Sequence, residues 1–184
     1  MQCKPAGLIK RTLDGNSLVP LHSRTDWRSF GADNGGGTEM HHSPILAPAL
    51  ALVIWTLVML VWMIVARMPA MKKAGIDVNK LTGGHPGALD GRIDDKAQWP
   101  AHNYMHLVEQ PTIFYAVVFI LALTGSGGGW NETLAWAYVI LRVLHSIVQA
   151  TFNRVIVRFS LFALSTLTLV ALTLHASMAV WNWH

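Results

Sequence analysis

The sequence predicts an all-α integral membrane protein, a bundle of four transmembrane helices. Three observations carry this prediction. First, 52% of the 184 residues are hydrophobic and only 13% are charged, whereas a soluble domain carries about 25% charged residues. Second, the mean hydropathy is +0.37. Third, long apolar stretches alternate with polar or glycine-rich connections. A chain of this length forms one domain, and its single cysteine, Cys3, excludes an intrachain disulfide.

The basic charge balance fits a membrane protein better than a nucleic-acid-binding one. The isoelectric point is about 9.5. The lysines and arginines lie in the N-terminal segment and in the connections beside apolar stretches, a placement that is typical of membrane orientation signals. We therefore expect membrane lipid around the chain and no nucleic-acid partner.

The N-terminal segment, residues 1–43, is polar and includes the glycine run at residues 35–37. It lacks the apolar stretch of a signal peptide, and its composition predicts a disordered tail. An alternative interpretation is that the natural start is Met40 and the preceding residues come from an upstream start codon. The four-span domain is expected over residues 44–184.

Each span follows from an apolar stretch of sufficient length. The first stretch ends at Ala66, and its roughly 22 residues can cross a hydrocarbon core of about 30 Å. The second stretch is too short alone, so its helix must begin near Pro100. Asn131 is a suitable N-cap for the third helix. The predicted spans are about 45–66, 100–124, 132–153 and 155–181.

The positive-inside rule predicts the orientation of these spans. The connection after the first span and the turn between the third and fourth spans carry Lys or Arg, and the glycine turn at residues 125–129 carries neither. The basic connections should therefore face the cytoplasm, with both termini on the non-cytoplasmic side.

Polar side chains within the spans form two stripes. His102, His106 and Glu109 fall at positions i, i+4 and i+7 of the second helix, and the third helix has a matching stripe at i, i+3, i+7 and i+11. The members of that stripe are Arg142, His145, Gln149 and Asn153. Both stripes should lie in the cytoplasmic half of the bilayer, where we expect Glu109 and Arg142 to form an ion pair.

Three interpretations of the stripes remain open from the residues alone. Polar groups can hold membrane helices together without any other function. They can also line a cavity for a polar ligand, because charged groups avoid lipid. Finally, His102 and His106 could hold zinc or iron. The second helix has no His-Glu-x-x-His pattern and no evident third ligand, so we predict no metal site.

At these same residues the sequence resembles the MAPEG family, the membrane-associated proteins in eicosanoid and glutathione metabolism. Residues 102–115 (HNYMHLVEQPTIFY) resemble the second-helix signature, and residues 135–145 (AWAYVILRVLH) resemble the third-helix signature of bacterial members. The resemblance covers roughly residues 45–178. It implies a four-helix subunit, a homotrimer, and a location in a bacterial inner membrane.

The resemblance also implies a site between neighbouring subunits, where catalytic members bind glutathione and act on a lipophilic small molecule. Arg158 matches the fourth-helix arginine that helps to stabilise the glutathione thiolate. The implied catalytic residues are Arg158 and Arg142. The implied glutathione-contacting residues are Glu109, His106, His102, Asn103, His145 and Gln149.

Several positions depart from the family pattern. Glutathione-binding members carry arginines just before the acidic residue of the second helix, where this chain has His102 and Met105. His106 replaces an asparagine, Gln149 replaces a tyrosine, and Phe159 replaces a serine. Without the two arginines the site lacks the guanidinium groups that bind carboxylates in bidentate fashion. Glutathione binding is therefore weakened relative to the family pattern.

Two functions are consistent with these residues. The first is a glutathione- or thiol-dependent transferase or peroxidase that acts on lipophilic substrates. The second is a non-enzymatic membrane module that binds lipid or organises a partner protein, which the missing arginines favour.

Overall fold

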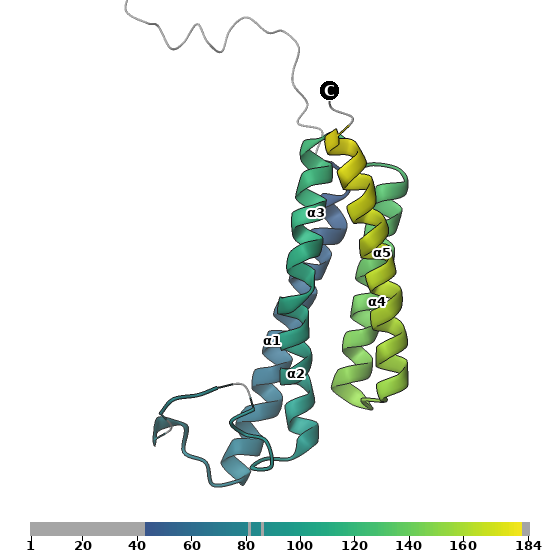
Figure 1. The fold of residues 1–184 in the computed structure, drawn as a ribbon. Helices are drawn as coiled ribbons and strands as arrows, with labels where there is room; N and C mark the ends of the chain where they lie inside the picture. Colours follow the sequence, from purple (N-terminus) through teal and green to yellow (C-terminus); the bar gives the residue numbers. More distant parts are fainter. Residues whose placement is uncertain (1–42, 81, 86, 182–184) are drawn as a thin grey trace, which may run out of the picture. The chain divides into compact units, whose positions relative to one another are not determined.

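The structure, a computed structural model, describes residues 43–80, 82–85 and 87–181. The predicted N-terminal tail, apart from Ser43, and the alternative start at Met40 lie outside the described residues. The described part is α-helical, with one short 3-10 turn and no strand (Figure 1). Its elements are α1 (Leu46–Lys73), η2 (Val78–Lys80), α2 (Asp95–Glu109), α3 (Pro111–Leu123), α4 (Trp130–Thr151) and α5 (Val155–Trp181).

These elements form four helices long and apolar enough to cross a membrane. They are α1, the combined α2–α3 segment, α4 and α5. The predicted all-α, four-span fold is confirmed. Helix α1 continues past the apolar stretch to Lys73, because the cations of its last turn interact favourably with the helix C-terminus.

The second span is one helix with a break near its middle. It begins at Asp95, earlier than the predicted start near residue 100, with Asp94 as N-cap accepting the Lys96 N–H at 3.1 Å. The break falls at Gln110, and Pro111 is the first residue of α3. Because proline has no N–H, the carbonyl of Leu107 loses its usual helical donor at this point.

The prediction that Asn131 caps the third helix is wrong. Helix α4 begins at Trp130, and the cap position is Gly129, which has a φ of +62°. Asn131 instead donates its side-chain N–H to the Ser126 carbonyl at 2.7 Å, and its Oδ1 lies 2.6 Å from Nδ1 of His175. The glycine turn can adopt a left-handed backbone, so the helix starts earlier and Asn131 links α4 to α5.

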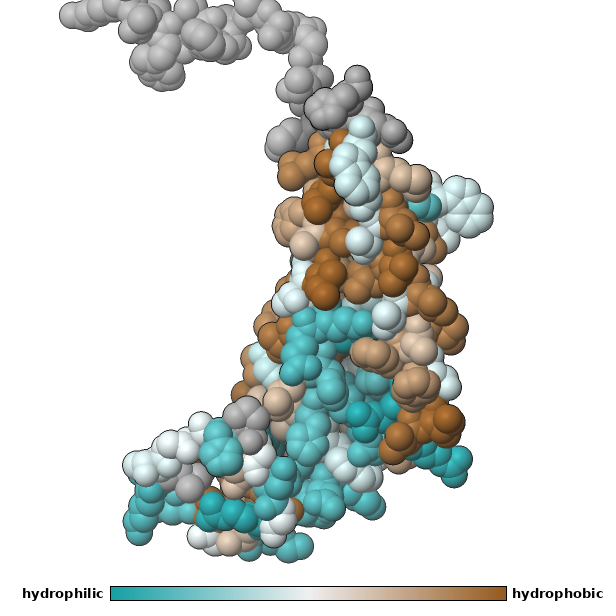
Figure 2. All heavy atoms as spheres, viewed as in Figure 1, coloured by the Kyte–Doolittle hydropathy of each residue, from teal (hydrophilic) through white to brown (hydrophobic). Residues whose placement is uncertain are grey.

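The bundle has two ends with different composition. We call the end that holds residues 124–129 the glycine-turn end, and the end that holds residues 74–94 and 152–154 the basic end. Buried apolar side chains of all four spans form the main core; the largest include Ile45, Leu52, Met59, Phe114, Leu121, Tyr138 and Leu172. On the face in Figure 2, hydrophobic residues cover the half toward the glycine-turn end, and hydrophilic residues gather toward the basic end.

Candidate functional site

A cavity of about 250 Å³ opens at the basic end, between α2, α4 and α5. Helix α4 packs against both α2 and α5, and past the break α3 packs against α5. We call this space the arginine cavity. Its lining residues are His106, His145, Val155, Arg158, Phe159 and Phe162. The four lining residues of α5 follow the spacing i, i+3, i+4, i+7, so they share one helix face.

The Arg158 side chain is held in place from the turn that precedes α5. Its Nη1 donates to Oδ1 of Asn153 at 2.6 Å, while its Nε is buried without a hydrogen-bond partner among the described residues. Asn153 has a φ of +49°, a left-handed conformation that asparagine tolerates better than most residues. The turn therefore aims one guanidinium into the arginine cavity.

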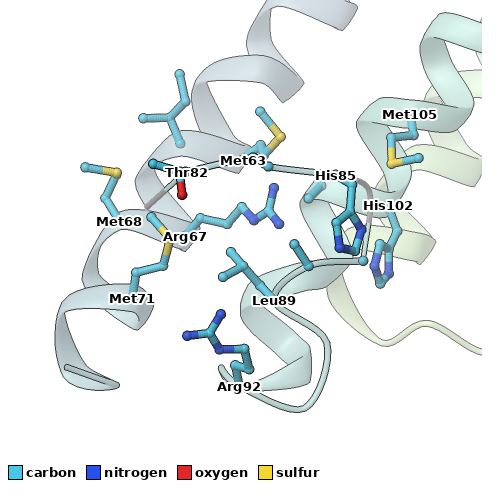
Figure 3. A pocket seen from close by; sticks show the side chains of 16 residues that line it. Met63, Arg67, Met68, Met71, Thr82, His85, Leu89, Arg92, His102 and Met105 are labelled. Atoms are coloured by element: carbon cyan, nitrogen blue, oxygen red, sulfur yellow. The ribbon is translucent and has the colours of Figure 1, made fainter. Parts of the chain in front are cut away.

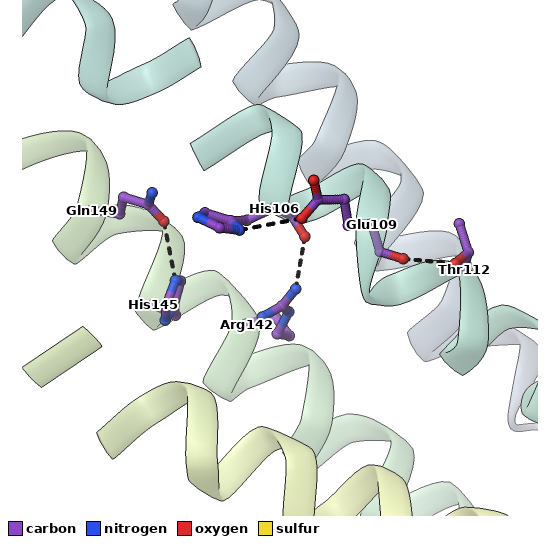
Figure 4. Close-up of polar contacts among 6 residues, drawn as sticks. All are labelled: His106, Glu109, Thr112, Arg142, His145 and Gln149. Carbon is purple, nitrogen blue, oxygen red and sulfur yellow. Dashed lines mark hydrogen bonds and ion pairs between the residues drawn. The ribbon is translucent and has the colours of Figure 1, made fainter. Parts of the chain in front are cut away.

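His145 connects α4 to the backbone of α5. Its Nδ1 lies 3.0 Å from the Arg158 carbonyl oxygen, and its Nε2 lies 3.1 Å from Oε1 of Gln149 (Figure 4). A carbonyl only accepts, so Nδ1 carries the proton in the first bond. The second bond then needs either the Gln149 amide nitrogen as donor or a doubly protonated imidazole. His145 and Gln149 are both buried, which fixes the imidazole at the cavity wall.

Arg142 lies behind the cavity rather than in its lining. Its side chain is 1% exposed, and its Nη2 donates to the His106 carbonyl at 2.9 Å (Figure 4). The guanidinium carbon lies 6.0 Å from the ring centroid of Tyr138 and 5.9 Å from that of Phe162, within the range of a cation–π interaction. Two of its nitrogens, Nε and Nη1, have no hydrogen-bond partner among the described residues.

The expected ion pair between Glu109 and Arg142 is wrong. Oε2 of Glu109 lies 3.5 Å from Nδ1 of His106, and the Glu109 side chain is 66% exposed (Figure 4). The reason is that the polar stripe of α2 does not face α4 along its whole length. Asn103 marks the side of α2 that faces α4, and at roughly 100° per residue Glu109 lies about 120° around the helix from it. The carboxylate therefore points away from α4, toward the outside of the bundle.

The two remaining α2 candidates have separate surroundings. Asn103 is fully buried and donates to Oγ of Ser146 at 2.6 Å, so it joins α2 to α4. His102 faces the connection before α2, with its Nε2 3.7 Å from Oδ1 of Asp90. The structure thus brings His106, His145 and Arg158 to the arginine cavity, places Arg142 and Gln149 behind its wall, and leaves His102 and Asn103 elsewhere.

Sequence reasoning missed several residues of the site. Phe159 and Phe162 line the cavity, and their spacing from Arg158 on a helix could have indicated this. The sequence prediction placed Asn153 on the third-helix stripe but not in the site. Its position between two helices, five residues before Arg158, could have indicated that it bonds this arginine. Nothing in the sequence indicated the role of Ser146, because serine is common in membrane helices.

The cavity offers a cation and an imidazole beside two aromatic rings. Among residues 43–80, 82–85 and 87–181, no group of three or more His, Cys, Asp or Glu side chains could hold a metal ion. A guanidinium next to apolar surface can stabilise an anion, such as a thiolate, that reacts with a lipophilic partner.

Fold and site together define a four-span membrane protein with a small cationic cavity in one half of its bundle. The MAPEG family model matches residues 45–178 of this chain. The chain therefore belongs to the MAPEG family, and the resemblance seen in its second and third helices is confirmed. No curated protein and no solved structure matches it.

Proposed function

We propose that this protein is a thiol-dependent transferase or peroxidase for lipophilic substrates, with glutathione as the thiol. The observation that carries the proposal is Arg158, whose guanidinium lines a cavity together with Phe159 and Phe162. A cation beside the sulfur lowers the pKa of a thiol, and the thiolate is the nucleophile. The phenylalanine rings supply the apolar surface that a lipophilic electrophile needs.

The proposed transfer reaction needs only the thiol and the electrophile. The thiolate sulfur forms a bond to an electrophilic carbon, and the leaving group departs with the bonding electron pair while the thiol proton passes to solvent. In the peroxidase variant, two thiols are oxidised to a disulfide, and the hydroperoxide is reduced to an alcohol and water. His145 and Arg142 act in both cases as positioning residues, since one bonds the Arg158 carbonyl and the other the His106 carbonyl.

The residues fit the thiol and the ammonium group of glutathione better than its carboxylates. Arg158 fits the thiolate, and the exposed Glu109 carboxylate fits the ammonium of the glutamyl group. The carboxylates of glutathione find no arginine on α2, where positions 102 and 105 hold His and Met. His106 offers such a carboxylate a positive charge only when protonated.

The site is proposed to be completed by a second subunit in a homotrimer. The cavity of about 250 Å³ is smaller than the roughly 300–1,000 Å³ of usual ligand pockets. Glu109 lies near the middle of the second span, and its side chain is 66% exposed. A carboxylate at that depth avoids lipid, so a neighbouring subunit is its expected cover.

The proposal is tested with the full-length protein in detergent. Conjugation of glutathione to a chlorodinitrobenzene electrophile and reduction of cumene hydroperoxide are measured for the native chain, Arg158→Gln and Arg154→Gln. Removing one electrostatic stabiliser costs about 10²-fold in rate, so Arg158→Gln should lose most activity. Arg154 is exposed in the same turn region, and Arg154→Gln should keep the activity of the native chain. The proposal is contradicted if the native chain turns over neither substrate and millimolar glutathione does not change its melting temperature.

The site is further proposed to face the cytoplasm of a bacterial inner membrane. In Figure 1 the connection before α2 and the turn between α4 and α5 lie at the same end of the bundle. Both segments carry Lys or Arg, the arginine cavity opens at this end, and the positive-inside rule assigns such an end to the cytoplasm. Labelling of single cysteines introduced at Lys73 and at Gly128, with Cys3 replaced by serine, by an impermeant reagent tests this orientation. Labelling at position 73 in intact cells contradicts it.

A non-enzymatic membrane module is the second candidate function. The specific observation in its favour is that no Lys or Arg of α2 lines the arginine cavity, and Arg142 is too buried to touch a ligand. Such a module would bind a lipid or organise a partner without using Arg158 chemically. Unchanged function in cells of an Arg142→Met and Arg158→Met double variant that still assembles would favour it.

A further inference from the structure

A second cavity, of about 660 Å³, lies at the basic end between α1, α2 and the connection that joins them (Figure 3). It is bounded by the end of α1, the connection before α2 and the second turn of α2, and it shares no lining residue with the arginine cavity. We call it the methionine pocket, after Met63, Met68, Met71 and Met105 in its lining. Of the residues to which the family resemblance assigns a role with glutathione, only His102 lines it.

Two guanidinium groups give this pocket a positive charge. Arg67 comes from α1 and Arg92 from the connection, and both reach toward the space between the two segments (Figure 3). The structure records no carboxylate within 4.0 Å of either among the described residues, and Nε of Arg67 is buried without a hydrogen-bond partner. The nearby acid, Asp90, faces His102 at 3.7 Å. The pocket therefore offers unneutralised cations to a ligand.

Apart from Thr82, His85 and His102, the rest of the lining is apolar, and its methionines make it adaptable. Methionine is unbranched and polarizable, so it fits chains of varied shape. Met63, Ile64 and Met68 belong to α1. Met63 and Ile64 lead from Arg67 back toward the apolar part of the helix, and Met68 follows Arg67 on the polar side. Ile64 and Met68 are each 49% exposed, so this wall is continuous with the outer surface of the span. An alkyl chain can lie along it without entering the core.

The depth of the pocket matches the boundary between hydrocarbon and headgroups. The apolar stretch of α1 ends at Ala66, and Arg67 is the next residue. Arginine near the end of a span places its cation at the interface. Cationic pockets between helices at this level are suited to anionic lipid headgroups.

We propose that the methionine pocket binds an anionic lipid, with its headgroup phosphate between Arg67 and Arg92 and an acyl chain along the methionine wall. Two guanidiniums can hold one phosphate through charge-assisted hydrogen bonds. A soluble phosphate ester shares the headgroup chemistry but not the chain, and the experiment separates the two.

Native mass spectrometry of the full-length protein in detergent tests the proposal, with phosphatidic acid, phosphatidylcholine and glycerol phosphate as probes. Phosphatidic acid should bind more tightly than phosphatidylcholine, and glycerol phosphate should not bind. In an Arg67→Gln and Arg92→Gln double variant the affinity for phosphatidic acid should fall about thirtyfold. Met68→Gln should lower it further by a smaller factor, because it removes only part of the chain contact.

Arg154→Gln is the matched control, since it removes an exposed cation at the same end of the bundle but outside the pocket. An equal loss in this control, equal binding of both lipids, or equal binding of glycerol phosphate would overturn the proposal. Circular dichroism of the double variant checks that its helices are intact, and Arg67→Lys with Arg92→Lys, which keeps both charges, should restore much of the affinity. Glutathione conjugation is measured in parallel, and it is expected to persist in the double variant.

Discussion

The two halves of the bundle hold their helices together by different means. Toward the glycine-turn end, the Phe114 and Tyr138 rings stack with centroids 4.4 Å apart, and both side chains are fully buried. Toward the basic end, buried polar side chains also join the helices, as in the hydrogen bond between Asn103 and Ser146. The apolar half is closely packed, whereas the polar half keeps a cavity. The two halves thus differ in whether they leave room for a ligand.

The boundary between the halves coincides with the break in the second span. Gln110 lies at the break and donates from its side-chain nitrogen to Oγ1 of Thr166 at 2.9 Å. Beyond it α3 packs against α5, and before it α2 packs against α4 and α1. The missing N–H of Pro111 allows this change of direction. The three predictions below probe the two halves separately.

The largest effect is expected in the apolar half, for Phe114→Ala. The substitution removes a fully buried ring and its stacking on Tyr138, which should lower the free energy of unfolding by about 3 kcal/mol. Phe119→Ala on the same helix is the control, because that ring is 60% exposed. Unfolding in sodium dodecyl sulfate, followed by circular dichroism, measures both. Equal losses would mean that the apolar half does not depend on this stack.

A smaller loss is expected for Gly127→Ala, at the tip of the same half. Gly127 accepts the Ile45 N–H at 3.1 Å, and a Cβ at this position would collide with Ser43 and lie 2.8 Å from Cγ2 of Ile45. The start of α1 must shift, at a cost of about 1–3 kcal/mol.

Gly128→Ala is the matched control for that substitution. A Cβ there meets only Pro44 at 3.8 Å, an ordinary contact. The same denaturation assay compares the two variants. A Gly128 variant as unstable as the Gly127 variant would show that the turn responds to any added side chain rather than to the approach of α1.

The smallest effect is expected in the polar half, for the hydrogen bond between Asn103 and Ser146. A double-mutant cycle with Asn103→Ala and Ser146→Ala should give a coupling energy of about 0.6 kcal/mol, as found for polar pairs between membrane helices. The two side chains are fully buried, so the single variants also report any loss of packing. A coupling energy larger than the loss of unfolding free energy in Phe114→Ala would reverse the comparison between the halves.

The sequence predicted the spans well because their signal is local. Apolar length and composition determine which stretches can cross a membrane, and all four such helices are present in the described structure. The His145 and Gln149 positions were also predictable, since both fall on one face of an amphipathic helix. Those inferences need no knowledge of how one helix is rotated against another.

Rotation and pairing could not be read from the sequence. The stripe on α2 was predicted correctly as a stripe, but its direction depends on which face packs on α4. That face is set by Asn103 and Leu107, both buried, so Glu109 points away from Arg142. The role of Asn131 failed for a similar reason, because its partner His175 lies 44 positions later in the chain. Whether the site binds glutathione and assembles as a trimer stays a prediction.

The outward position of Glu109 also bears on how the protein is made. A charged group costs roughly 2.5–3.5 kcal/mol at the centre of an isolated helix, so the polar α2 segment is a poor independent insertion signal. Helix α1 precedes it and packs against it, and we expect the two to enter the bilayer as a hairpin. Before it joined the proposed homotrimer, a newly synthesised chain would still expose the carboxylate on its outer face. We therefore expect unassembled copies to be short-lived in cells, with membrane proteases removing those that fail to find partners.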